Sequence, residues 1–131
     1  MKKVFLGGTC NDSTWRRQLI SQLQIDYFDP VVDNWTPEAQ KEEIRQRELC
    51  DFCLYVLTPL MTGVYSIAEV VDDSNKHPGK TIFCYLTVDG GVRFKEGQIK
   101  SLDAVGMLIV RNGGKWCKSL ESTADLLNSY Q

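Results

Sequence analysis

The sequence predicts an α/β domain in which helices cover both faces of a parallel, five-stranded sheet. Short apolar runs alternate with amphipathic stretches along the whole chain, and one run, Phe52–Leu57 (FCLYVL), is almost entirely apolar. Parallel strands that are buried on both faces have such continuous apolar runs, and their connections are long enough to form helices. Because no repeat, low-complexity segment or linker interrupts the alternation, residues 1–131 are predicted to form a single domain.

The first two strands and the first helix follow from apolar residues bounded by turn residues. Lys3–Gly7 (KVFLG) is predicted to be a buried strand. Ser13 is expected to cap a helix that runs to about Leu23, because a serine hydroxyl can accept a hydrogen bond from the first helical turn. Tyr27–Phe28 is predicted to be a short second strand that ends at Asp29–Pro30, since proline has no N–H to continue a ladder.

The next helix and the central strand have the clearest patterns. Thr36 is expected to cap a charged helix that has proline at its first position and ends near Cys50. Phe52–Leu57 is predicted to be the central strand, and Thr58–Pro59 breaks it. A third helix is predicted over Val64–Asp73, directly after a loop that contains glycine.

The last elements have weaker patterns. A turn at His77–Gly79 leads into a strand at Thr81–Leu86. Beyond it we expect a short helix at Glu96–Ala104, a fifth strand at Met107–Val110 and a last helix at Lys115–Leu127. Because crossovers between parallel strands are right-handed, this succession favours the flavodoxin-like sheet order 2-1-3-4-5, a three-layer, Rossmann-like arrangement.

The composition excludes several classes of function. The chain has 15 basic and 17 acidic residues, a net charge of −2, and so lacks the basic excess of proteins that bind polymeric nucleic acid. No stretch approaches the roughly 20 apolar residues that span a bilayer, so we expect a cytoplasmic protein without membrane contact. The five cysteines are expected to be reduced, and the one CxxC pair, Cys50 and Cys53, lacks the second pair of a zinc site. No metal or cofactor is expected.

Glycine and polar residues gather where this fold would bind a ligand. Ligands of such sheets lie beyond the carboxyl ends of the strands, at the point where the strand order reverses, here between the first and third strands. Backbone N–H groups around Gly8 can approach an anion there, although a tight turn between strand and helix has the same sequence. Neither a G-x-G-x-x-G nor a P-loop motif is present. The candidates at this edge include Gly8, Thr9, Asp29, Asn34, Thr62, Gly63 and Ser66.

Two helices carry glutamates that could meet over the same edge. Glu69 lies on the second turn of the third predicted helix, and Glu42 and Glu43 lie on the helix before it. Successive right-handed crossovers can place these helices side by side. A close carboxylate pair is what retaining cleavage of a glycosidic bond requires, whereas most helix glutamates are simply solvated. The spacing allows both interpretations.

Several segments resemble the nucleoside 2-deoxyribosyltransferase-like family. They are Val4–Thr9, Trp15–Arg16, Asp29–Pro30, Leu49–Pro59 and Gly63–Glu69, and the resemblance covers about residues 3–87. In that family a small flavodoxin-like domain cleaves the N-glycosidic bond of deoxynucleosides or their monophosphates, through a glutamate that forms a covalent glycosyl-enzyme intermediate. The resemblance therefore implies a small-molecule nucleoside or nucleotide substrate, and assembly into homodimers or larger homo-oligomers.

The resemblance also implies roles for individual residues. Glu69 matches the nucleophile, and Glu43 stands where an acidic residue assists catalysis. The sugar, or its 5′ phosphate, is expected to contact Gly8, Thr9, Thr62, Gly63 and Ser66. Trp35 follows the second strand beside Asn34, and it is the aromatic residue that we expect to stack on the base.

Three departures from the family keep other functions open. Phe5 replaces the tyrosine whose hydroxyl borders the nucleophile, Val70–Val71 replaces a glycine-containing pair after it, and Thr58–Gly63 lacks an acidic residue. The first hypothesis is an enzyme that cleaves or transfers at the N-glycosidic bond. The second is a catalytically inactive module that binds or senses a nucleotide, and the third is an interaction or NAD-cleaving domain of the Toll/interleukin-receptor type.

Overall fold

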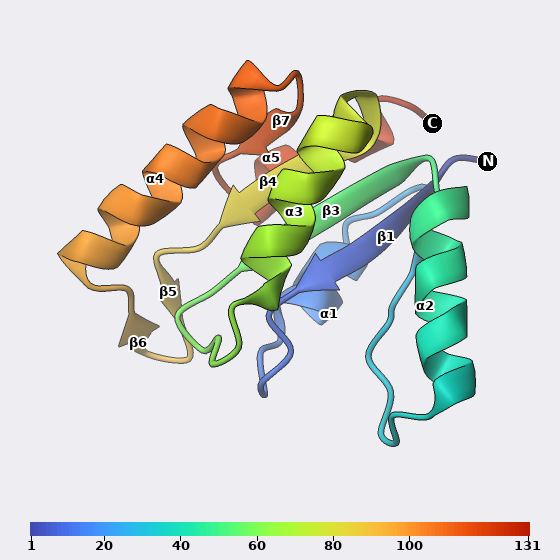
Figure 1. Ribbon diagram of the computed structural model, residues 1–131, viewed down its shortest axis with the longest axis horizontal. Coiled ribbons are helices and arrows are strands. Elements are labelled where there is room, and N and C mark those ends of the chain that lie inside the picture. The colour runs from blue at the N-terminus through green and yellow to red at the C-terminus, as the bar shows by residue number, and fades with distance from the viewer.

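The computed structural model describes residues 1–131 and contains one central parallel sheet. Its strand order is β2-β1-β3-β4-β7, which confirms the predicted order with β7 as the fifth strand (Figure 1). The strands of this sheet are β1 (Lys3–Gly8), β2 (Asp26–Phe28), β3 (Phe52–Leu57), β4 (Thr81–Tyr85) and β7 (Lys115–Cys117). The helices are α1 (Trp15–Ile20), α2 (Pro37–Leu49), α3 (Tyr65–Lys76), α4 (Glu96–Arg111) and α5 (Leu120–Asn128).

The helices divide between the two faces of the sheet. In Figure 1, α2, α3 and α4 lie on the near side, and α1 and α5 lie on the far side. All four pairings of adjacent strands are parallel. Such pairs need crossovers over the sheet, and these helices are the crossovers. The three-layer α/β fold is therefore as the sequence predicted.

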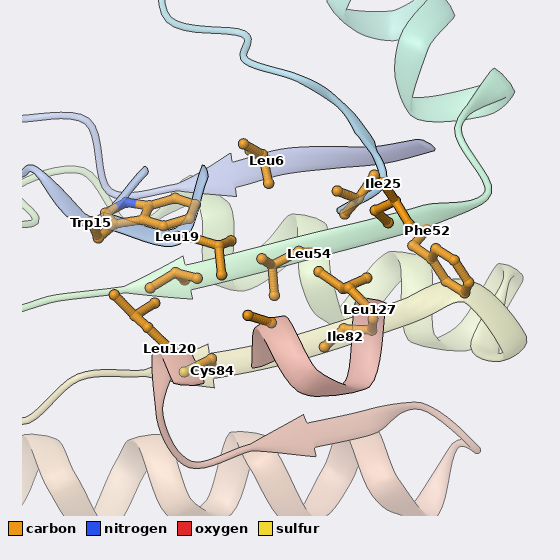
Figure 2. Packing of buried hydrophobic residues seen from close by; sticks show 13 residues of the cluster. Leu6, Trp15, Leu19, Ile25, Phe52, Leu54, Ile82, Cys84, Leu120 and Leu127 are labelled. Carbon is orange, nitrogen blue, oxygen red and sulfur yellow. The ribbon is translucent and has the colours of Figure 1, made fainter. Parts of the chain in front are cut away.

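The face covered by α1 and α5 is packed mainly by apolar side chains. Strand residues alternate between faces, so Leu6, Leu54 and Ile82 from three neighbouring strands point to this side (Figure 2). Trp15 and Leu19 of α1 complete the layer and are at most 1% exposed. The cluster contains 13 buried residues. This layer is the larger part of the core.

The face covered by α2, α3 and α4 has a second apolar cluster of 10 buried residues. Phe5, Tyr55 and Phe83 point to this side from β1, β3 and β4. Val70 of α3 and Ile109 of α4 pack against them and are fully buried. Unlike the first cluster, this one borders buried charged groups, which are described below.

The prediction of a strand at Met107–Val110 is wrong. These residues belong to α4, which continues from the predicted helix Glu96–Ala104 through to Arg111. Leu102, Gly106 and Ile109 form its buried stripe, with spacings of four and three residues. The run Met107–Val110 was predicted to be a strand because Met107 and Val110 are apolar as well. Both side chains are nevertheless exposed, at 56% and 51%.

The last helix begins later than predicted, since Lys115–Cys117 forms β7. This segment pairs with β4, with Phe83 opposite Trp116. Gly113, at φ 101°, and Gly114 make the turn from α4 into the strand. The helix then starts after Ser119, whose hydroxyl accepts a hydrogen bond from the N–H of Ser122 at 3.0 Å. The predicted helix start at Lys115 is wrong because Ser119 is the cap.

Two further details differ from the prediction near the start of the chain. Helix α1 ends at Ile20, before the predicted end at about Leu23. Its N-cap residue is Thr14 rather than Ser13. The Ser13 hydroxyl still accepts a hydrogen bond from the N–H of Trp15, the first residue of the helix, at 3.3 Å, and it donates to Asp89 at 2.6 Å. Asp89 belongs to a small antiparallel hairpin, β5 (Val88–Asp89) with β6 (Val92–Arg93), that the sequence did not predict.

None of the helices is long and apolar enough to cross a membrane.

Candidate active site

A cleft opens at the carboxyl ends of β1 and β3, where strand order reverses. It consists of two adjoining hollows of about 230 and 370 Å³. Four residues, Gly8, Cys10, Ser66 and Glu69, line both hollows. Glu69 therefore lies at their junction and faces a ligand placed in either.

The structure brings Glu43 and Glu69 into the first hollow. Helix α2 connects β2 to β3, helix α3 follows β3 on the same face of the sheet, and each contributes one glutamate to the lining of this hollow. The Glu69 side chain is only 13% exposed, and Glu43 is half-buried. Glu42 lies outside the lining, and its carboxylate bonds instead to Arg45 and Gln46, each at 2.8 Å.

Arg47 connects Glu69 to a buried carboxylate. Its Nη1 lies 3.2 Å from Oε2 of Glu69, and its Nη2 donates to Oδ1 of Asp73 at 2.9 Å. The hydroxyl of Tyr55 donates to the other oxygen of Asp73 at 2.5 Å. The Asp73 side chain is 8% exposed. The four side chains form one chain of polar contacts from β3 across α3 and α2 to the cleft.

Burial controls the ionisation of both cleft glutamates. Desolvation raises the pKa of Glu43, while the positive charges of Arg47 and Arg16 act in the opposite direction. Desolvation also raises the pKa of Glu69, with Glu43 and Asp73 adding to the rise and Arg47 opposing it. Two carboxylates in one desolvated cleft favour a state in which one of them holds a proton.

The loop after β1 makes the tightest approach between backbones in the cleft. Gly8 has φ 119°, and a Cβ on it would lie 2.0 Å from the Val56 carbonyl oxygen, so only glycine fits. The Thr9 hydroxyl accepts from the N–H of Thr58 at 2.9 Å and is 5% exposed. Thr9 thus fixes the loop while it lines the second hollow.

The side chain of Arg16 also stabilises the loop after β1. Its guanidinium donates to the carbonyl oxygens of Leu6, Gly8 and Thr9 at 3.0, 3.3 and 2.6 Å. Desolvation lowers its pKa, although Cys10 and Asp29 oppose the change. Buried carbonyls need donors, and Arg16 supplies them while it lines the first hollow.

The first hollow has an apolar wall that suits a flat ring. Its apolar lining residues are Phe5, Pro30, Val31, Val32 and Trp35. Trp35 is 57% exposed, so its ring is free to cover a bound group. Asn34 is exposed and lines neither hollow. Asp29 lies outside the lining and supports the wall, since its carboxylate accepts from the Val31 N–H at 2.9 Å and lies 3.6 Å from Arg16.

The second hollow adjoins the start of α3. Thr62, Gly63 and Ser66 line it. Asn11 donates to the Thr62 hydroxyl at 2.8 Å, which ties the two loops together. No side chain caps the first turn of α3, so its free N–H groups favour a negatively charged ligand group.

Three of the buried charged residues at the site, Arg16, Arg47 and Asp73, had no role in the sequence-based hypothesis. Arg47 is four residues after Glu43, so the two share a face of α2, and this spacing was the available signal. Asp73 gave no such signal, because nothing in the local sequence distinguishes it from Asp72 beside it, which is exposed. Its burial depends on partners from other elements.

No group of three or more His, Cys, Asp or Glu side chains has the arrangement of a metal site. All five cysteines are free, and Cys50 and Cys53 are buried.

A known protein family matches the part of the chain that forms this site. The model of the nucleoside 2-deoxyribosyltransferase-like family matches residues 1–87, which include every residue that lines the two hollows. No curated protein and no solved structure gave a significant match to the chain. The matched segment covers more than half of the chain and both of its candidate catalytic glutamates. The chain belongs to the nucleoside 2-deoxyribosyltransferase-like family.

Proposed function

We propose that the protein cleaves the N-glycosidic bond of a nucleoside or nucleoside 5′-monophosphate, with Glu69 as nucleophile and Glu43 as proton donor and acceptor. The observation that carries the proposal is the pair of half-buried glutamates in one cleft, with Glu69 at the junction of its two hollows. Two such carboxylates suffice for a double displacement at an anomeric carbon.

The first half of the reaction forms a glycosyl-enzyme. An oxygen of the ionised Glu69 attacks C1′ of the sugar, and the bond from C1′ to the base nitrogen breaks, leaving its electron pair on the base. Glu43, whose pKa is raised by burial, gives its proton to the departing base. The negative charge that Glu43 then carries is next to Arg16 and Arg47, which stabilise it.

The second half releases the sugar from Glu69. Water or a second base attacks C1′ and gives its proton to Glu43, while the bond from C1′ to Glu69 breaks and restores the carboxylate. Attack by water is hydrolysis, and attack by a second base is transfer. Both begin from the same intermediate, so the geometry of the two glutamates serves either outcome.

The two hollows offer space for the remaining parts of the proposed substrate. With C1′ at Glu69, the base lies in the first hollow against Trp35 and the valines. The 5′ substituent then lies in the second hollow, near Ser66 and the uncapped start of α3. A phosphate there would accept hydrogen bonds from the first-turn N–H groups.

One observation favours the alternative of a module that binds without turnover. Phe5 borders the first hollow with a side chain that has no hydroxyl, so it cannot donate to Glu69. The same cleft, with the same two hollows, would then hold a nucleotide without cleaving it.

The test is release of free base, measured by chromatography, from deoxynucleosides, ribonucleosides, their 5′-monophosphates and NAD, with and without an acceptor base. Glu69→Gln should lower the rate by on the order of a thousandfold or more, because the amide cannot attack C1′. The matched control is Asp72→Asn, an exposed acid three residues further along α3 that pairs with Lys76. It should release base at the wild-type rate.

Binding by calorimetry separates the two functions. Wild-type protein that binds a monophosphate but releases no base from any substrate would select the binding module. Cleavage confined to NAD would favour the Toll/interleukin-receptor interpretation. Equal rates in wild type and Glu69→Gln would exclude Glu69 as nucleophile.

A further inference from the structure

Arg47 is placed where one cation meets three acids. Its guanidinium contacts Glu69 and Asp73 through different nitrogens, at 3.2 and 2.9 Å, and its charge also acts on Glu43. The side chain is 23% exposed, so solvent screens these contacts only weakly. Removing Arg47 would leave the cleft with several half-buried carboxylates and no adjacent cation on α2.

Asp73 and Tyr55, which do not line the cleft, hold Arg47 in place. Tyr55 is fully buried in β3, and its hydroxyl bonds one oxygen of Asp73 while Arg47 bonds the other. Each oxygen of this buried carboxylate therefore has a donor. If the guanidinium turned away from Glu69 and Asp73, Oδ1 of the buried Asp73 carboxylate would lose its donor and its positive partner, which carries a free-energy penalty.

Packing alone does not account for this arrangement. A buried ion pair often adds no net stability over apolar groups of the same volume. The Nε of Arg47 is buried and has no hydrogen-bond partner. The orientation of the guanidinium thus leaves one donor unsatisfied while it satisfies Glu69 and Asp73.

We propose that Arg47 is a positioning residue, which Asp73 and Tyr55 hold in place so that it fixes the orientation and the negative charge of the Glu69 carboxylate. The inference rests on the proposed function for the use of that charge. The contact between Arg47 and Glu69 does not depend on the proposed function, because it exists in the protein without substrate. Tyr55 and Asp73 do not line either hollow, so they act on substrate only through Arg47.

Titratable and charged groups from several elements surround Glu69. Arg47 and Glu43 face it from α2, Asp73 lies on its own helix, and Tyr55 reaches it from β3 through Asp73. Cys10 and Arg16 line the same hollow from the β1–α1 region. Of these groups, Arg47 favours the ionised form of Glu69, and it is in direct contact with the Glu69 carboxylate.

The test measures the titration of the Glu69 carboxyl in the free protein by ¹³C NMR, with the signal assigned from its loss in Glu69→Gln. In Arg47→Gln the pKa of Glu69 should rise, and its ionisation constant should fall by about tenfold or more, because the opposite charge is gone. Arg47→Lys should shift it less, since a charge remains. Arg45→Gln, an exposed arginine on the same helix, is the matched control and should leave it unchanged.

Base release gives a second readout of positioning. Lysine cannot bond two carboxylates with a rigid fork. Arg47→Lys should therefore have a lower kcat on the pH plateau with little change in KM. Tyr55→Phe keeps the ring and fold but frees Asp73, so it should lower kcat several-fold in the same direction, again with KM unchanged.

The two proposals fail in different ways. An unchanged or lower pKa of Glu69 in folded Arg47→Gln, or equal kcat in wild type and Tyr55→Phe, would overturn the positioning role. A titration that shifts as expected in a protein that releases no base would keep the contact and reject the glycosidic reaction. Thermal unfolding of each variant confirms that the fold is retained before titration.

Discussion

The two faces of the sheet are built differently. The α1/α5 face is packed by 13 apolar residues. The α2/α3/α4 face has 10 buried apolar or aromatic residues, and beside them it buries Asp73 and most of Glu69 and Arg47. The same strands contribute to both, since alternate residues point to opposite sides.

The difference separates stability from chemistry. Apolar burial stabilises the fold at about 25 cal/mol per Å², whereas burying charge has a free-energy cost unless every group is paired. A face that accepts this cost next to a cleft is a candidate for function. We therefore expect substitutions on the first face to change mainly stability, and substitutions on the second to change mainly activity.

The largest expected effect on stability is on the apolar face. Leu54→Ala should lower the free energy of unfolding by about 2–5 kcal/mol, because Leu54 is fully buried and its loss leaves a cavity. Urea denaturation followed by circular dichroism measures this change. Glu69→Gln on the other face is expected to change it by less than about 1 kcal/mol. If Glu69→Gln were more destabilising than Leu54→Ala, the proposed division between a face for stability and a face for activity would be wrong.

Thiol reactivity tests whether the two faces are closed except at the cleft. Burial raises the pKa of Cys84 on the first face to about 11 and that of Cys53 on the second to about 12. Cys10 is exposed in the cleft. Its labelling by a disulfide reagent at pH 8 should be on the order of a hundredfold faster than that of the buried thiols.

The control is Cys10→Ser, in which the fast labelling phase should disappear. Because Cys10 lines both hollows, the bulky label on it should also prevent nucleotide binding. A fast phase that survives in Cys10→Ser would mean that one face opens to solvent.

The smallest expected effect is the pH dependence that the second face adds to stability. Burial raises the folded-state pKa of Glu43 and Glu69 above the ordinary value of 4.5. Their protonated forms therefore stabilise the fold below about that pH, and this stabilisation is lost as the pH rises through the raised values. Urea denaturation between pH 4 and 7 should show a flatter profile in Glu43→Gln/Glu69→Gln than in wild type. A steeper decline in the double variant would contradict the raised pKa values.

The prediction from sequence succeeded where local patterns agree with tertiary packing. The strands β1, β3 and β4 have apolar runs bounded by glycine or proline, and Thr36 caps α2 as expected, since its hydroxyl accepts from the Ala39 N–H at 3.1 Å. The failure at Met107–Val110 has the opposite cause, because exposed apolar residues on α4 hide its helical period.

The position of the cleft could also be predicted, since the strand order and its reversal follow from the order of strands and helices. Glu69 and Glu43 were named because successive right-handed crossovers can place their helices side by side, and because both match acidic positions of the family that the sequence resembles. Their burial could not be predicted. On the helical wheel Glu69 shares a side with Tyr65, which is 73% exposed, so spacing alone allowed a solvated carboxylate.

Local chemistry was therefore enough to predict the α/β alternation, the order of the sheet, the Thr36 cap of α2 and the edge of the sheet at which the cleft lies. The contacts among Glu69, Arg47, Asp73 and Tyr55 depend on the tertiary structure, because they join residues 18 to 26 positions apart on three elements. Hydrophobic periodicity reports the average side of a helix that faces the core. Whether a charged residue on that helix is buried depends on which partner another element brings to it, and only the folded chain decides that pairing.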